Sequence, residues 1–253
     1  MYHISVERAQ IHMMGDSVNH KFGLCLLIAL RSIVFLMTSL LLFVALNIPF
    51  DNLSKWWTLL VLFCNIVTIL VLLFICRAKE TTYWNFINFE KGKTKRKTIV
   101  IVMFVMLVVG MCGMQLAGLI SYGEIPHFPI MMIQPIPLWI AIINIFLLPL
   151  TTTVAEDGIY LGAINQNDSK SIVIGSAFFY ALQHSFIPFL PDARFILYRF
   201  LSFLPIAIIM CFWYRKNKNP LPFMVGHFVL NLATVVQIVI ISASPGMLEQ
   251  MLS

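Results

Sequence analysis

Polar and ionisable side chains occur inside stretches that are otherwise apolar enough to face lipid. They are Glu156 with Asp157, then His184, then His227 with Asn231. An ionisable group inside a bilayer is costly, so each is a candidate functional residue. A carboxylate and an imidazole can take a proton from water, while an imidazole and a carboxamide can donate hydrogen bonds to an oxyanion. Such a set can activate water.

The spacing within each stretch predicts which side chains share a helix face. Residues four apart lie one above the other on a helix. Three pairs have this spacing: Glu156 with Tyr160, Tyr180 with His184, and His227 with Asn231. A bundle that turns these three faces inward would gather a carboxylate, two imidazoles, a carboxamide and phenols.

The elements that must position these groups are membrane helices. Of 253 residues, 60% are hydrophobic and 11% are charged, and the mean hydropathy is +0.89. A helix needs roughly 20 apolar residues to cross about 30 Å of hydrocarbon. Barrel strands would alternate between apolar and polar residues with a period of two, and the apolar stretches do not show this pattern. We therefore expect an all-α, polytopic bundle of about seven spans, at 22–46, 57–76, 98–120, 138–163, 171–190, 195–214 and 221–243.

The basic residues predict the orientation of the bundle. A cytoplasmic N-terminus places 13 lysines and arginines inside and three outside, with Arg31 within a span. This positive-inside bias favours an external C-terminus. The cluster from Lys91 to Lys97 is interpreted as a signal that retains its loop in the cytoplasm, rather than as a site for nucleic acid or anionic lipid.

This orientation places the polar groups at similar depths. With the helical rise of about 1.5 Å per residue, Glu156 lies about 13 Å from the cytoplasmic end of its span. His184 lies about 21 Å in, and His227 and Asn231 lie about 10 and about 16 Å in. All four are therefore expected in one slab towards the cytoplasmic side.

The chain reads as one membrane domain, residues 1–253, without repeats. Four prolines between Ser121 and Pro137 predict an irregular external crossing there. Residues Gly162 to Lys170 have the composition of a loop and predict a hairpin between the fourth and fifth spans.

The three polar fragments resemble those of the CPBP family, the CAAX proteases and bacteriocin-processing enzymes also called Abi. That family has a Glu-Glu-x-x-x-Arg element, then Phe-x-x-x-His, then His-x-x-x-Asn/Asp. This chain has Glu156-Asp157 followed by Leu161, then Tyr180 to His184, then His227 to Asn231. The resemblance implies an intramembrane endopeptidase with its catalytic core at residues 137–235.

The chain departs from the family pattern in three places. Asp157 replaces the second glutamate, Tyr180 replaces phenylalanine, and Leu161 stands where the family has an arginine. That arginine is expected to pair with the second acid. Asp157 therefore either needs another partner, for which Arg31 and Arg199 are the candidates, or must remain protonated.

The resemblance implies a role for each residue. Glu156 and His184 would activate water, and His227 with Asn231 would stabilise the oxyanion. Asp157, Tyr160 and Tyr180 would support them, Asp157 by orientation or proton sharing. Alternatively, a metalloprotease would hold Zn²⁺ with ligands such as Glu156, His184 and His227. The lack of HExxH favours the mechanism without a metal or other cofactor.

The expected partners are membrane lipid and a peptide or lipidated-protein substrate, with no nucleic acid; the sequence does not define the oligomeric state. The compact size and the lack of organellar targeting suggest a multi-pass protein of a bacterial plasma membrane, with the endoplasmic reticulum as the alternative. The missing arginine leaves open a non-enzymatic class, a scaffold, immunity factor or regulator. A transporter is disfavoured, because neither inverted repeats nor discontinuous helices are visible.

Overall fold

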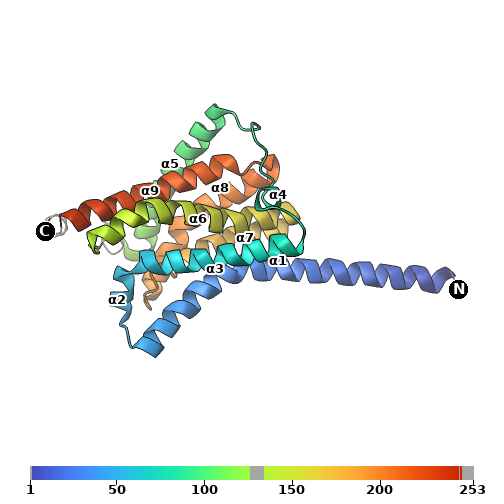
Figure 1. Ribbon diagram of the computed structural model, residues 1–253, viewed down its shortest axis with the longest axis horizontal. Helices are drawn as coiled ribbons and strands as arrows, with labels where there is room; N and C mark the ends of the chain where they lie inside the picture. Colours follow the sequence, from blue (N-terminus) through green and yellow to red (C-terminus); the bar gives the residue numbers. More distant parts are fainter. Residues whose placement is uncertain (1, 126–133, 245, 247–253) are drawn as a thin grey trace.

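The computed structural model describes residues 2–125, 134–244 and 246, and it consists of helices (Figure 1). The prediction of an all-α protein is confirmed. The helices are α1 (Tyr2–Leu46), α2 (Phe50–Lys55), α3 (Trp57–Ala78), α4 (Tyr83–Phe86), α5 (Arg96–Tyr122), α6 (Leu138–Gln166), α7 (Lys170–His184), α8 (Ala193–Asn217) and α9 (Leu221–Ala243).

Within the described residues, six helices are long and apolar enough to cross a membrane. They are Lys21–Ala45 of α1, and α3, α5, α6, α8 and α9. Each coincides with a predicted span, because twenty apolar residues can hide their backbone polar groups in lipid only by forming a helix. The chain therefore has the composition of a multi-pass membrane protein.

The remaining predicted span, the fifth at 171–190, is shorter than expected. Helix α7 ends at His184, and its 15 residues rise about 22 Å, less than the hydrocarbon thickness. A turn follows, in which Phe186 and Phe189 form an isolated bridge. Pro188 and Pro191 explain the early end, since proline lacks the N–H that a continuing helix needs. His184 therefore lies at a helix terminus.

The predicted irregular crossing 121–137 is only partly described. Helix α5 continues to Tyr122, and residues 126–133 lie outside the described part. The predicted hairpin is tighter than expected, since α6 extends to Gln166 and α7 begins at Lys170.

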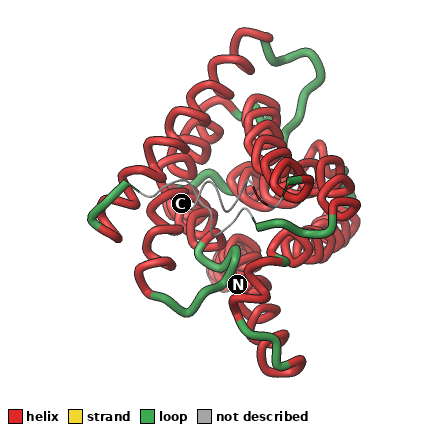
Figure 2. The backbone as a smooth tube through the Cα atoms, turned by 90° about the vertical axis from the view of Figure 1, so that its left-hand side faces the viewer, coloured by secondary structure: helices red, strands yellow, loops and turns green. Residues whose placement is uncertain are grey.

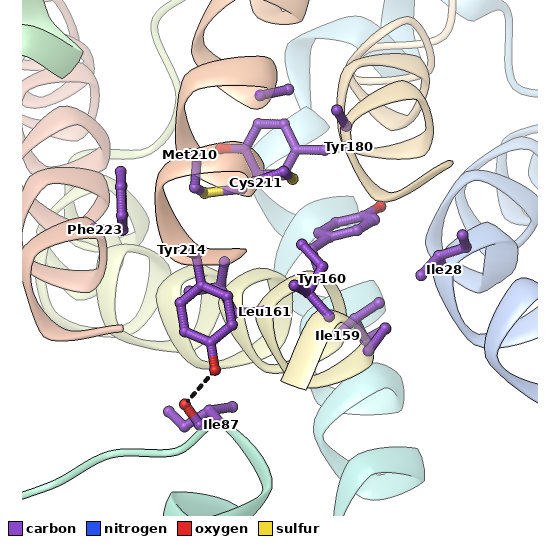
Figure 3. Packing of buried hydrophobic residues seen from close by; sticks show 14 of the residues in the cluster. Ile28, Ile87, Ile159, Tyr160, Leu161, Tyr180, Met210, Cys211, Tyr214 and Phe223 are labelled. Atoms are coloured by element: carbon purple, nitrogen blue, oxygen red, sulfur yellow. Dashed lines mark hydrogen bonds between the residues drawn. The ribbon is translucent and has the colours of Figure 1, made fainter. Parts of the chain in front are cut away.

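Helix α6 packs against α7, α8 and α9, and α5 packs against α8 and α9. Helix α7 packs against α8, while α3 lies against α6 and α1 against α7. Seen along the long axis, most helices appear end-on (Figure 2). The larger hydrophobic cluster fills the space between α6, α7 and α8, and Figure 3 shows part of it, with the Tyr214 hydroxyl donating to the carbonyl oxygen of Ile87 at 2.8 Å.

Two glycines on α6, the helix that carries the acids, let α4 pack closely against it. A Cβ at Gly158 would overlap Leu72 and crowd Tyr83, and a Cβ at Gly162 would overlap the Phe86 ring. Phe86 is 1% exposed. The two glycines are one helical turn apart on α6, so their shared face receives two aromatic rings of α4.

Candidate active site

Glu156 and Asp157 lie side by side on α6 and are both buried, at 1% and 0% exposure. Adjacent positions on a helix point in different directions. Glu156 contributes to the wall of a cavity of about 430 Å³. Asp157 instead faces α9. The two acids therefore have different surroundings, although they are neighbours in sequence.

His227 of α9 lies between these two carboxylates. Its Nε2 is 3.4 Å from Oε2 of Glu156, and its Nδ1 is 3.3 Å from Oδ1 of Asp157. The ring is 4% exposed. Because α6 packs against α9, residues that are 70 positions apart form one acid–imidazole–acid chain.

His184 of α7 approaches Glu156 from another direction. Its Nε2 is 4.0 Å from Oε2 of Glu156, too far for a direct hydrogen bond. Its Nδ1 is 2.7 Å from the carbonyl oxygen of Tyr180, one turn earlier. The ring stacks on Phe203, with centroids 3.6 Å apart and an interplanar angle of 12°. The backbone and the stack therefore fix the orientation of His184.

Arg31 of α1 is the cation of this cluster. Its Nη2 lies 2.9 Å from Oε1 of Glu156, and the arginine is fully buried. The expectation that Arg31 or Arg199 pairs with Asp157 is wrong: Arg31 pairs with Glu156, and Asp157 pairs with His227. A lone arginine inside an apolar run was the sequence signal for such a pairing, but the sequence did not identify which acid it meets.

Arg199 of α8 has a different environment. It donates to the carbonyl oxygen of His184 at 3.2 Å and to that of Ile187 at 2.9 Å, and its guanidinium lies 4.9 Å from the centre of the Phe203 ring. It thus satisfies carbonyl groups at the C-terminal end of α7, where a cation is also favoured by the helix dipole.

The two tyrosines singled out in the sequence differ in their contacts. The Tyr180 hydroxyl is 3.5 Å from Nε2 of His227, and Tyr180 lines the cavity. The Tyr160 hydroxyl donates to the carbonyl oxygen of Phe179 at 3.2 Å. Tyr160 is fully buried, and its ring meets that of Tyr180 edge to face in the hydrophobic cluster (Figure 3).

Asn231 lies one turn beyond His227 and also lines the cavity. Its Nδ2 donates to the carbonyl oxygen of His227 at 3.0 Å. One amide N–H is therefore used by the backbone of its own helix, and the second N–H remains as a donor.

The cavity joins the polar cluster to a mostly apolar wall. Its polar part contains Glu156, Tyr180, His184, His227 and Asn231. Its apolar part is contributed chiefly by α3, α5 and α8, and includes Trp57, Leu107, Met111, Met114, Phe203 and Ile206. Such a cavity suits a ligand with an apolar body and one reactive polar group.

The donor set does not match a metal centre. Among the described residues, no group of three or more histidine, cysteine or acidic side chains has the arrangement to hold an ion. In addition, one oxygen of Glu156 is engaged by the Arg31 guanidinium, whose charge would repel a cation beside it. The predicted Zn²⁺ ligands therefore do not fit the ion in this arrangement.

The fold and the site together define a polytopic helical membrane protein with a buried acid–histidine cluster beside an apolar cavity. Residues 134–233 match the family model of the type II CAAX prenyl endopeptidases, described as Rce1-like. These residues therefore match the CPBP, or Abi, family that the sequence fragments predicted. No curated protein and no solved structure matches the chain significantly.

Proposed function

We propose that this protein is an intramembrane endopeptidase, and that Glu156 and His184 activate the water that attacks the peptide bond. The observation that carries the proposal is the position of Oε2 of Glu156. It lies 4.0 Å from Nε2 of His184 and 3.4 Å from Nε2 of His227, beside the cavity. The Rce1-like domain supports the same activity.

The hydrogen bonds of His184 identify the atom that can accept a proton. A carbonyl oxygen only accepts, so the contact with Tyr180 requires the hydrogen to be on Nδ1. In the neutral ring, Nε2 then keeps its lone pair and faces Glu156. A gap of 4.0 Å between two acceptors suits one water that donates to both. Its oxygen would attack the carbonyl carbon as its proton passes to one of these bases.

The charges suggest a different role for His227. Arg31 balances Glu156, which leaves Asp157 to be balanced by His227. A protonated His227 would donate from both nitrogens and could stabilise the negative oxygen of the tetrahedral intermediate, together with the free N–H of Asn231. When the C–N bond breaks, the leaving amine takes back the proton that the water gave up.

The apolar wall and the family indicate the class of substrate. We propose a peptide that is anchored in the membrane, with a prenylated protein tail as the first candidate. The distribution of basic residues favours a cytoplasmic N-terminus and a site towards the inner face, so the scissile bond would be presented from the cytoplasm or from the inner leaflet. A bacterial plasma membrane remains our proposed location.

The test is cleavage of a fluorogenic farnesylated peptide with a CAAX-type C-terminus by the purified protein in lipid nanodiscs. Glu156→Gln should abolish cleavage, because the amide cannot accept a proton from water. A matched control is Gln237→Glu, which adds a carboxyl group to the same cavity away from the histidines. A deletion phenotype that Glu156→Gln complements fully would instead favour a scaffold or regulator.

A further inference from the structure

The guanidinium of Arg31 contacts four side chains from three other helices. Such an arrangement leaves it little freedom, because the bonds engage all three nitrogens of the planar group. The contacts are Nε to Oε1 of Gln183 at 2.6 Å, Nη1 to Oγ1 of Thr68 at 3.1 Å, Nη2 to Oδ1 of Asn65 at 3.0 Å, and Nη2 to Oε1 of Glu156 at 2.9 Å.

We propose that Arg31 is a positioning residue of the active site, which orients Glu156 and supplies its counterion. This inference deepens the proposed function and rests on it. Arg31 holds Oε1 of Glu156, so Oε2 is the oxygen left to face the histidines. The unbound oxygen is buried and makes no hydrogen bond with the described side chains, as expected for an acceptor that waits for water.

The same guanidinium also acts on the second base. Gln183 directly precedes His184 at the end of α7, and it accepts the shortest bond of Arg31. Glu156 and the terminus that carries His184 are therefore tied to one rigid group. Arg31 thereby sets the distance between the two acceptors that share the proposed water.

Electrostatics explains why this cation must be present. A buried carboxylate without a partner tends to take up a proton and is then a poor base. Asp157 faces His227, and Arg199 contacts backbone carbonyls, so among the described residues Arg31 is the cation on Glu156. The motif position that holds arginine in the resembling family is occupied here by Leu161, which is fully buried. The counterion of Glu156 lies outside that motif, on α1.

This assignment extends the active site beyond the family segment. Helix α1 lies outside residues 134–233, and α3 supplies two of the polar groups that hold Arg31. We therefore expect that the segment alone does not form a working site, because its carboxylate lacks a counterion.

The first test measures thermal unfolding of the full chain in detergent, without any substrate. Arg31→Met and Glu156→Gln each leave one buried charge unpaired, so each should lower Tm. The double variant has neither charge, so its decrease in Tm should be smaller than the sum of the decreases in the two single variants. Thr68→Val is the matched control: it removes another bond of Arg31 but no charge, and its effect should be largely additive with Glu156→Gln. If the effects of Arg31→Met and Glu156→Gln on Tm were also additive, the proposed pairing of these two residues would be wrong.

The second test measures cleavage of the farnesylated peptide. Arg31→Met should lower kcat by about hundredfold, as expected when a reacting group is misplaced. KM should change little, because Arg31 does not line the cavity. Arg31→Lys should recover part of kcat, since it keeps the charge but not the planar fork.

The outcomes separate this inference from the proposed function. If the unaltered protein cleaves the peptide and Arg31→Met cleaves it equally fast, the positioning role is wrong and the peptidase proposal stands. If the pair is coupled in the unfolding experiment but the unaltered protein cleaves no peptide, the proposed function is wrong. Arg31 is then a structural residue only.

Discussion

Nδ1 of His184 lies 2.7 Å from the carbonyl oxygen of Tyr180, within the same helix. This short contact fixes the tautomer of the neutral ring, because the carbonyl group has no hydrogen to donate. Phe203 stacks on the ring and fixes its plane. The reactive nitrogen is thus directed at Glu156 by the backbone of α7 and by Phe203 of α8.

His184→Gln should lower kcat by about 10²- to 10⁴-fold, the usual contribution of a general base. The fold should persist, since the glutamine can still pack on Phe203. Peptide cleavage and thermal unfolding are measured on the same sample. A variant that is fully active and equally stable would assign His184 to structure.

Asp157→Asn should also lower kcat, because His227 would lose the anion that balances its proton. We expect a loss of at least about tenfold, comparable to the effect of removing a carboxylate behind a metal-bound or catalytic histidine. Asp157→Glu keeps the charge and should retain more activity than Asp157→Asn. Equal activities of the two variants would show that the charge on residue 157 has no role in catalysis.

The two tyrosines should respond differently to loss of the hydroxyl group. Tyr180→Phe removes a group beside Nε2 of His227 and should lower kcat with little change in Tm. Tyr160→Phe removes a hydrogen bond to a backbone carbonyl and should cost about 1 kcal/mol of stability at unchanged kcat. The reverse pattern would exchange the roles of the two residues.

Gly162→Ala should destabilise the protein by about 1–3 kcal/mol, the usual cost of overpacking. Its Cβ would overlap the ring of Phe86. Gly110→Ala is the matched control in another helix, where the nearest atom, Cδ1 of Ile206, would be 3.5 Å from the new Cβ. That change should be neutral or stabilising, because alanine favours a helix by about 1 kcal/mol over glycine. Chemical denaturation in detergent measures the free energy of unfolding of both variants and of the unaltered protein.

Activity should survive a metal chelator. The acid and histidine groups do not form a metal cluster in the described residues, and Arg31 binds one oxygen of Glu156. Cleavage is measured before and after dialysis against 1,10-phenanthroline, with metal analysis of the same protein. Loss of cleavage that added zinc restores would favour the metalloprotease alternative.

The sequence alone was sufficient to predict the membrane-length helices and the family that residues 134–233 match. Six of seven expected spans appear as membrane-length helices, because hydropathy is a property of the local segment. The order of Glu156, His184, His227 and Asn231 was sufficient to predict the Rce1-like domain over 134–233. The early end of α7 could have been predicted from the sequence, because Pro188 lies within the predicted span 171–190.

The partners of each charge were decided only by the tertiary structure. Arg31 and Glu156 are 125 residues apart, and no periodicity within one helix specifies which face of a distant helix it will meet. Helical spacing placed Tyr160 and Tyr180 equally near the site, yet packing directed one hydroxyl to a backbone carbonyl and the other to His227. Local sequence determines which segments form helices, whereas the pairing of buried charges depends on how all the helices pack together.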